Sequence, residues 1–218
     1  MSIKALVLFS GGQDSTTCLA QACNDFPGRV AAVAFDYGQR HRVELEQAQI
    51  IAKLADVPLT VVPLPFISDL TSNALTRPDM DIATPTDSLP NTFVDGRNLF
   101  FLSVAAVIAK QQDCSILYTG VCETDYSGYP DCRQSFITSC TETLNLAMDY
   151  TFEIRTPLMY LTKAETVLLM KNLNCLDWYA HTHTCYNGQR PACGTCPACE
   201  LRLKGFADAG LTDPLEYQ

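Results

Sequence analysis

Two groups of residues in this sequence have the types and spacing to do chemistry: a glycine loop near the start and four cysteines near the end. The loop, SGGQDSTT at 10–17, follows the apolar run ALVLF at 5–9. Adjacent glycines allow a tight turn and close approach to a ligand, and their N–H groups can bind an anion together with the start of a helix. The hydroxyls of Ser10, Ser15 and Thr16 add donors. The loop fits a pyrophosphate, although a tight strand-to-helix turn would also account for it.

One carboxylate, Asp14, stands among these anion-binding groups. An acid beside phosphates makes chemical sense when Mg²⁺ lies between them. The order of residues differs from GxxxxGK[ST], from GxGxxG and from the GxSxG elbow of hydrolases. The sequence therefore predicts a phosphate-binding site of another type that uses Mg²⁺, with Asp14 as the best candidate for contact with the metal.

The four cysteines near the end have the spacing C-x7-C-x2-C-x2-C, at Cys185, Cys193, Cys196 and Cys199. Four thiolates satisfy the tetrahedral preference of Zn²⁺, and four protein ligands close its coordination sphere. We therefore expect a structural zinc rather than a catalytic one. Two alternatives remain open at this point: four reduced cysteines that pack without a metal, and a redox-active C-x2-C pair.

Composition limits the class of protein. The 218 residues are 47% hydrophobic and 18% charged, which is typical of a globular protein. The net charge of −9 disfavours direct binding of nucleic acid. The apolar run at the start is too short for a signal peptide, and the longest one, near 99–109, falls short of the roughly 20 residues of a membrane helix. We expect a cytoplasmic protein whose 11 cysteines are reduced or metal-bound.

Strand and helix patterns alternate along the chain, which predicts an α/β fold with a doubly wound, Rossmann-like parallel sheet. Thr162 and Glu165 fit a capping box, and 71–96 is expected to be a long surface loop. We expect a nucleotide-binding domain over 1–175 and a small zinc-binding subdomain over 176–218. The expected strands are 5–9, 29–36, 58–64, 115–120 and an extended 152–158; the expected helices are 15–23, 42–56, 98–111, 135–148 and 162–173.

Polar and glycine-rich segments follow three of the expected strands, at 10–12, 36–40 and 120–125. Parallel sheets of this kind bind ligands beyond the carboxyl ends of their strands. The three segments are therefore expected to meet at a single site.

The SGGQDS loop resembles the SGGxDS loop of the ATP pyrophosphatase superfamily, whose members cleave ATP between its α- and β-phosphates and leave AMP on an acceptor oxygen. The rest of the chain, from about 5 to 205, is similar to the 7-cyano-7-deazaguanine synthase family of the queuosine pathway. Asp95 departs from the pattern, since a less charged residue is expected before Gly-Arg-Asn. The segments that carry the likeness are FDYGQRH at 35–41, NTFVDGRN at 91–98, TGVCETDYSGYPDCRQSF at 119–136, TPLMYLTKAE at 156–165 and the cysteine quartet.

The resemblance implies an adenine-nucleotide-hydrolase-like fold and an ATP-dependent ligase. Such an enzyme converts 7-carboxy-7-deazaguanine and ammonia to the nitrile through an adenylated carboxylate and an amide. It also implies one structural Zn²⁺ per chain, Mg²⁺ with ATP and a homodimer, with no direct contact with nucleic acid or membrane.

The resemblance further implies a set of site residues. Arg97 would clamp a phosphate or the substrate, and Lys163 would face an anion, although either side chain could instead be a solvated surface charge. A carboxylate such as Asp125 or Asp131 would bind the guanine edge, Arg133 would meet the substrate carboxylate, and Tyr126 or Tyr129 would stack on the ring, although any of these residues could instead fix the loop. The catalytic set is Asp14, Ser15, Arg97 and Lys163. The ATP-binding set is Phe9, Ser10, Gly11, Gly12, Gln13, Asp14, Ser15, Thr16, Thr17, Asp36, Tyr37, Gly38, Gln39, Arg40, Arg97 and Gly120. The substrate-binding set is Glu123, Asp125, Tyr129, Asp131 and Arg133.

Two other functions compete with this interpretation. A tRNA thiolase of the same superfamily would need affinity for tRNA and a catalytic cysteine pair. A zinc-ribbon interaction module would carry a vestigial nucleotide site. The acidic net charge counts against the first, and the intact loop with Asp14 counts against the second.

Overall fold

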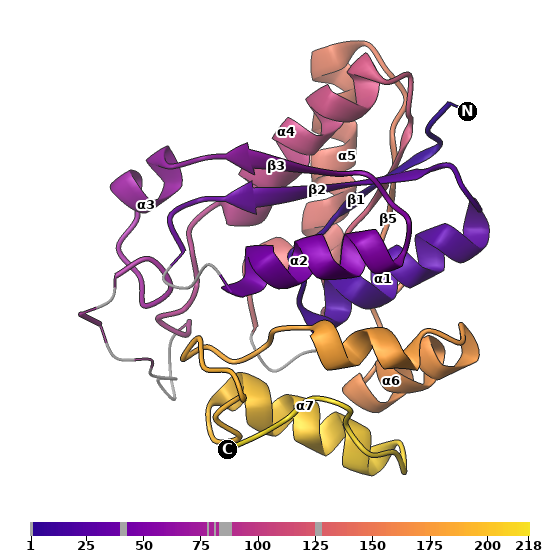
Figure 1. The fold of residues 1–218 in the computed structure, drawn as a ribbon. Coiled ribbons are helices and arrows are strands. Elements are labelled where there is room, and N and C mark those ends of the chain that lie inside the picture. Colours follow the sequence, from indigo (N-terminus) through magenta and orange to yellow (C-terminus); the bar gives the residue numbers. More distant parts are fainter. Residues whose placement is uncertain (1, 40–42, 78, 81, 83–88, 125–127) are drawn as a thin grey trace.

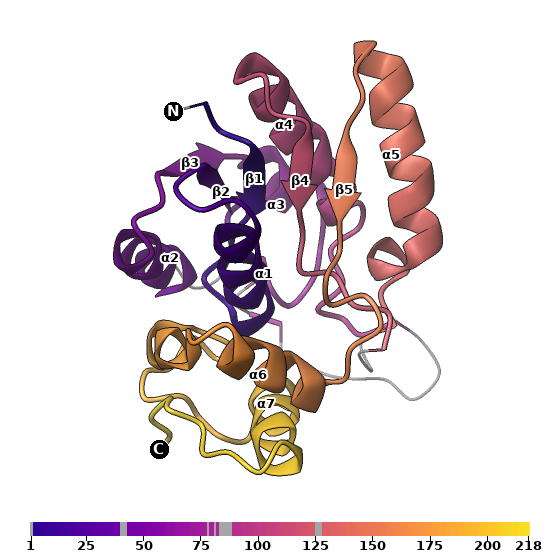
Figure 2. The same cartoon turned by 90° about the vertical axis from the view of Figure 1, so that its right-hand side faces the viewer.

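The computed structural model describes residues 2–39, 43–77, 79–80, 82, 89–124 and 128–218. Its centre is a sheet of five parallel strands in the order β3-β2-β1-β4-β5 (Figure 1 and Figure 2). Because the chain first runs from β1 to β3 and then returns to β4 on the other side of β1, the order reverses between β1 and β4. A ligand site is expected at that reversal. The strands are β1 (Ala5–Leu8), β2 (Val30–Asp36), β3 (Leu59–Pro63), β4 (Ile116–Tyr118) and β5 (Glu153–Arg155).

Helices connect the strands and cover both faces of the sheet (Figure 2). The α-helices are α1 (Gln13–Asp25), α2 (Val43–Leu54), α3 (Phe66–Leu70), α4 (Arg97–Gln111), α5 (Gln134–Met148), α6 (Lys163–Asn172) and α7 (Pro197–Asp208). Two 3₁₀ helices, η1 (Pro130–Cys132) and η2 (Leu176–His181), complete the described elements. No described helix has both the length and the apolar character that crossing a membrane requires.

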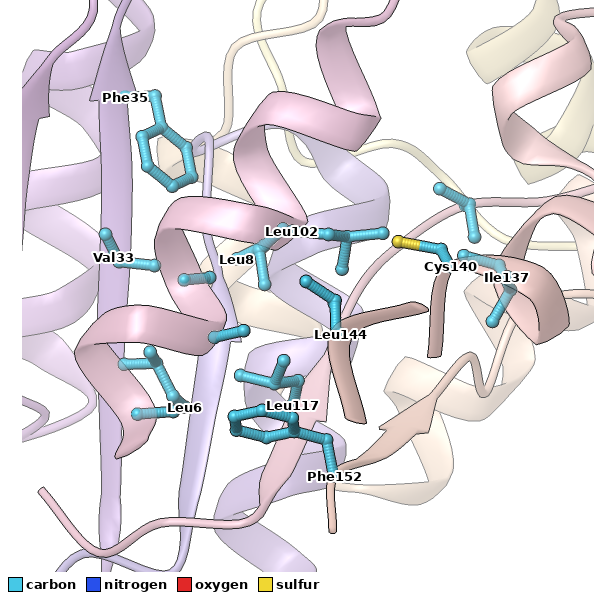
Figure 3. Close-up of a cluster of buried hydrophobic side chains, with 14 of the residues drawn as sticks. Leu6, Leu8, Val33, Phe35, Leu102, Leu117, Ile137, Cys140, Leu144 and Phe152 are labelled. Carbon is cyan, nitrogen blue, oxygen red and sulfur yellow. The ribbon is translucent and has the colours of Figure 1, made fainter. Parts of the chain in front are cut away.

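Side chains of β1 alternate between two buried clusters. Leu6 packs with Leu102 of α4 and Leu144 of α5, in the cluster that Figure 3 shows. Its neighbour Val7 packs on the opposite face with residues of α1 and α2, such as Leu19. Successive side chains of a strand point to opposite faces, so a strand covered on both faces reads as a continuous apolar run. The doubly wound parallel sheet predicted from the sequence is confirmed.

The expected elements lie within a few residues of the observed ones, and the predicted capping box is present. Thr162 Oγ1 accepts from Glu165 N at 3.2 Å, while Glu165 Oε2 accepts from Thr162 N at 2.8 Å. The described part of 71–96 contains no helix or strand, as expected for a loop. The sequence patterns did not predict α3, η1, η2 or α7, which are short or, for α7, begin inside the cysteine motif.

The last part of the chain lies beyond the carboxyl ends of β4 and β5, where α6 and α7 sit side by side (Figure 2). One apolar cluster joins Ala20 of α1, Val167 and Met170 of α6, Tyr179 of η2 and Phe206 of α7. The cluster spans both of the predicted domains, because α6 belongs to the first and α7 to the second. The boundary between 175 and 176 stays a prediction.

Candidate functional site

A cavity of about 350 Å³ opens at the carboxyl ends of the strands. Its wall combines the loop after β1, the end of β2, the start of α4, the segment after β4, the start of α6 and residues near the end of the chain. Thirteen of the predicted site residues line it: Phe9, Ser10, Gly12, Gln13, Asp14, Ser15, Tyr37, Gln39, Arg97, Gly120, Tyr129, Lys163 and Cys185.

The glycine loop has the close backbone packing that its sequence suggests. Gly11 has φ +81, and a Cβ at this position would lie 2.6 Å from the Glu44 carbonyl oxygen. A Cβ on Gly120 would lie 3.1 Å from Ser15 N, so the loop after β4 also approaches the start of α1 closely. Gly12 caps α1 without a side-chain hydrogen bond. The first N–H groups of α1 therefore remain for an anion at the cavity wall.

Asp14 and Lys163 form an ion pair inside the cavity wall. Lys163 Nζ lies 2.7 Å from Asp14 Oδ2, which explains how a cation is tolerated at the first position of α6. The other oxygen, Asp14 Oδ1, is buried and has no hydrogen-bond partner among the described residues. A buried carboxylate oxygen of this kind fits a hard cation such as Mg²⁺.

Gln13, beside Asp14, adds an unused donor. Its side chain is 3% exposed, and Nε2 has no hydrogen-bond partner in the described part of the chain. A buried amide of this kind is satisfied when a ligand supplies an acceptor. The loop thus offers both a donor and an acceptor to a cavity ligand.

Arg97 also lines the cavity, and its charge acts on two other lining residues, Tyr37 and Glu44. Burial raises the pKa of Tyr37, and a hydrogen bond from Arg97 opposes that effect. Burial also raises the pKa of Glu44 to about 7, against the opposing charge of Arg97. Asp131 Oδ2 accepts from Asn98 N at 3.1 Å and so caps the start of α4. The wall therefore presents a fixed guanidinium and an acid that titrates near neutral pH.

The predicted substrate-binding residues have different positions. Tyr129 lines the cavity, and its hydroxyl lies 2.6 Å from Thr92 Oγ1. Asp131 caps α4, and Glu123 Oε2 accepts from Gln134 N at 3.1 Å at the start of α5. Neither of these carboxylates lines the cavity, nor does the exposed Arg133. Three predicted site residues, Asp125, Tyr126 and Arg40, lie outside the described residues.

Five other residues of the predicted ATP-binding set do not line the cavity. Thr16 Oγ1 donates to Gly12 O at 2.8 Å within α1. Thr17 Oγ1 lies 2.6 Å from the Tyr179 hydroxyl and so joins α1 to η2. Gly38, with φ +80, leaves no room for a Cβ beside Ser68. The five residues are Gly11, Thr16, Thr17, Asp36 and Gly38.

The four cysteines of the quartet converge on one point. Their sulfur atoms all lie within 4.8 Å of one another, and Cys193 Sγ is 3.9 Å from Cys199 Sγ. Hydrogen bonding with Cys199 lowers the pKa of the Cys196 thiol, and Cys196 N donates to Cys193 Sγ at 3.3 Å. The pKa of the Cys193 thiol is lowered as well. Four converging sulfurs, two of them favoured as thiolates, fit a single tetrahedral metal ion.

Several cavity residues could not be found from the sequence. Glu44 comes from the first turn of α2, and Tyr186 and Arg202 come from the segment around the quartet. Their spacing carries no ligand motif, because segments far apart in the sequence bring them to the cavity. FDYGQRH, three residues before Glu44, was the nearest signal in the sequence.

Comparison with known proteins identifies relatives over nearly the whole chain. The family described as "Queuosine biosynthesis protein QueC" matches residues 4–210. A 7-cyano-7-deazaguanine synthase of Chromobacterium violaceum is 55% identical over 97% of this chain and 92% of its own length.

Solved structures resemble the chain more distantly. An NH₃-dependent NAD synthetase of Campylobacter jejuni has a TM-score of 0.49 and 14% identity, over 80% of this chain and 66% of that one. The U34-tRNA thiolase NcsA of Methanococcus maripaludis, solved with its [4Fe-4S] cluster, has a TM-score of 0.45 and 13% identity, over 79% and 57% of the two chains.

Proposed function

The chain belongs to the family of the queuosine biosynthesis protein QueC, and on this premise we propose that it is an ATP-dependent ligase that makes 7-cyano-7-deazaguanine. The substrates are 7-carboxy-7-deazaguanine, ammonia and ATP. The name of the 55% identical relative supports this reaction. The observation in the structure that carries the proposal is the meeting of the glycine loop, Arg97 and Lys163 around one cavity.

The glycine loop and the start of α1 bind the triphosphate in this proposal. The first N–H groups of α1 and the Gln13 amide would supply donors. The Ser10 and Ser15 hydroxyls, whose oxygens lie 3.1 Å apart, line the same cavity. Asp14 Oδ1 is the oxygen that would hold Mg²⁺, which neutralises charge on the pyrophosphate leaving group. Lys163, already beside Asp14, lies within the same wall and adds a second cation.

The reaction begins when the substrate carboxylate attacks the α-phosphate of ATP and releases pyrophosphate. Ammonia then displaces AMP from the acyl carbon and leaves an amide. The amide oxygen then attacks the α-phosphate of a second ATP and releases pyrophosphate, and loss of AMP and protons leaves the nitrile. Adenylation is needed because a carboxylate is a poor electrophile. Arg97, with its fixed planar charge, stabilises the oxyanions that develop in these steps.

Tyr129 is the substrate-binding residue that the geometry supports best. It is buried in the cavity wall, where its ring would stack on the deazaguanine. Roles for Glu123, Asp125, Asp131 and Arg133 stay predictions. The quartet is proposed to hold a structural Zn²⁺, supported by its four converging sulfurs. A cytoplasmic homodimer without direct contact with nucleic acid completes the proposal.

The deciding experiment incubates the purified chain with 7-carboxy-7-deazaguanine, ammonium, Mg²⁺ and ATP, and follows the base by mass spectrometry. The expected result is a nitrile, with AMP and pyrophosphate formed. An unchanged base, with AMP formed only when tRNA and a sulfur donor are present, would support the thiolase. The interaction module predicts no ATP turnover under either condition.

A further inference from the structure

The segment 182–186 touches both the glycine loop and the cysteine quartet. His183 N donates to Gly11 O at 3.0 Å, and a Cβ on Gly12 would lie 3.4 Å from His183 O. Two residues later, Cys185 contributes a sulfur to the quartet and also lines the cavity. His183 Nε2 lies 2.9 Å from Cys185 O, so the segment is braced within itself.

Arg202 of α7 holds the same segment from the other side. Its Nη1 donates to Thr182 Oγ1 at 2.6 Å and to Thr184 Oγ1 at 2.9 Å. The guanidinium pairs with Asp213 at 2.7 Å and is only 1% exposed. A buried guanidinium with this many partners has a single available geometry.

The quartet fixes α7 relative to the segment. Cys196 caps α7 and Cys199 lies in its first turn, one turn before Arg202 and on the same face of the helix. An ion bound to all four sulfurs ties Cys185 to these two cysteines, while Arg202 ties Thr182 and Thr184 to the helix. The position of 182–186 against Gly11 and Gly12 therefore depends on both links.

We propose that metal binding at the quartet and nucleotide binding at the glycine loop strengthen each other, with Thr182 and Arg202 as positioning residues. The inference rests on the proposed function, since it takes the cavity ligand to be a nucleotide. Ordering of 182–186 costs conformational entropy, and either ligand supplies that order for the other. The factor by which bound metal raises the affinity for nucleotide must therefore equal the factor by which bound nucleotide raises the affinity for the metal; we call this the coupling factor.

The test uses the whole chain loaded with Co²⁺, whose absorption bands report tetrahedral thiolate coordination. Cobalt is titrated out with a chelator at fixed Mg²⁺, with and without saturating α,β-methylene-ATP, and calorimetry measures nucleotide binding in parallel. We expect bound nucleotide to raise the apparent cobalt affinity about 5-fold or more.

Paired variants at Thr182 test whether the coupling runs through the hydrogen bonds of Arg202 to Thr182 and Thr184. Thr182→Val keeps the size of the side chain but removes the acceptor of Arg202, so the coupling factor is expected to fall toward 1. Thr182→Ser keeps the hydroxyl and should retain the coupling. Thr184→Val tests the second link at a half-buried position, should Thr182→Val not fold. Asp208→Asn, exposed at the far end of α7, is the control that should couple as the wild type does.

Three outcomes would overturn the inference. Nucleotide that binds the wild type without changing its cobalt affinity would exclude coupling. Full coupling in both Thr182→Val and Thr184→Val would exclude the path through Arg202. Failure of the cobalt-loaded wild type to bind nucleotide would overturn the proposed function as well, and calorimetry separates that failure from the first.

Discussion

At the scale of single residues, Asp14 connects most of the proposed chemistry. One of its oxygens pairs with Lys163 at 2.7 Å, and the other is buried without a hydrogen-bond partner among the described residues. An unsatisfied buried acceptor is costly to leave unless a ligand completes it. This geometry supports the proposal that Asp14 contacts an ion that arrives with the nucleotide.

Asp14→Asn is expected to lower ATP turnover about 100-fold or more while the fold persists, because an amide is a poorer ligand for Mg²⁺ and leaves Lys163 without its carboxylate. Turnover is measured as AMP release, and folding as the melting temperature. Asp69→Asn, at an exposed position in α3, removes one charge elsewhere and should behave as the wild type. Wild-type turnover by Asp14→Asn would remove this residue from the metal role.

Glu44 makes a pH-dependent contribution to stability. Burial raises its pKa from an ordinary 4.5 to about 7, so between these values the folded chain holds a proton that the unfolded chain has released. The free energy of unfolding therefore falls as the pH rises through this window, by up to ~1.4 kcal/mol per pH unit. Above pH 7 the effect is constant.

Glu44→Gln should remove this slope. Denaturant unfolding of the wild type and the variant between pH 4.5 and 8 measures it, and their difference isolates Glu44. Glu46→Gln, exposed on the same helix, should keep the wild-type slope. Parallel curves for the wild type and Glu44→Gln would show that Glu44 ionises in the folded chain as it does in water.

At the scale of elements, the glycine loop depends on close contact between β1, α1 and α2. Gly11 lets the backbone turn with φ +81 while α2 passes directly behind it, with Glu44 O and Ala48 N within 2.7 Å of a Cβ position. Backbone atoms of a helix cannot move aside easily. The loop conformation is therefore built by packing as well as by the freedom of glycine.

Gly11→Ala is expected to destabilise the chain by about 2–4 kcal/mol, because it combines a strained φ with a clash against helix backbone. Gly28→Ala is the matched control: its φ is +67, but nothing lies within 4 Å of the Cβ position. That variant should cost only about 1 kcal/mol. Denaturant unfolding measures both, and equal costs would show that the approach of α2 is not tight.

At the scale of the whole molecule, residues from both ends of the sequence line one cavity. Residues of the quartet segment and α7 line the same cavity as the loop after β1. The cysteine quartet and the glycine loop therefore meet at one cavity, although the quartet has its own small apolar cluster with Ala192 and Leu215.

Cys196→Ala is expected to lose the metal and unfold the segment around α7, because structural metal binding is coupled to folding. Metal analysis and limited proteolysis of 176–218 report the two effects. Cys175→Ala, whose sulfur lies outside the quartet, should keep its metal and its resistance to protease. A soluble Cys196→Ala chain with full metal content would contradict the assignment of the quartet.

The sequence by itself determined the local elements and the two chemical motifs. Continuous apolar runs such as ALVLF, separated by helix patterns, predicted a sheet covered on both faces. A strand that is buried on both sides needs apolar residues at every position. The cysteine spacing predicted convergence of Cys185, Cys193, Cys196 and Cys199, because short-range turns bring C-x2-C sulfurs together. These features depend on neighbours along the chain.

Only the tertiary structure decided which residues share the cavity. Glu44 and Arg202 reach it through packing between distant segments, which no local pattern encodes. The same packing turned Asp131 and Glu123 toward helix starts, where their carboxylates accept backbone N–H groups. A carboxylate in a polar loop has the same appearance in sequence whether it binds a ligand or caps a helix, because the difference lies in what the fold places beside it.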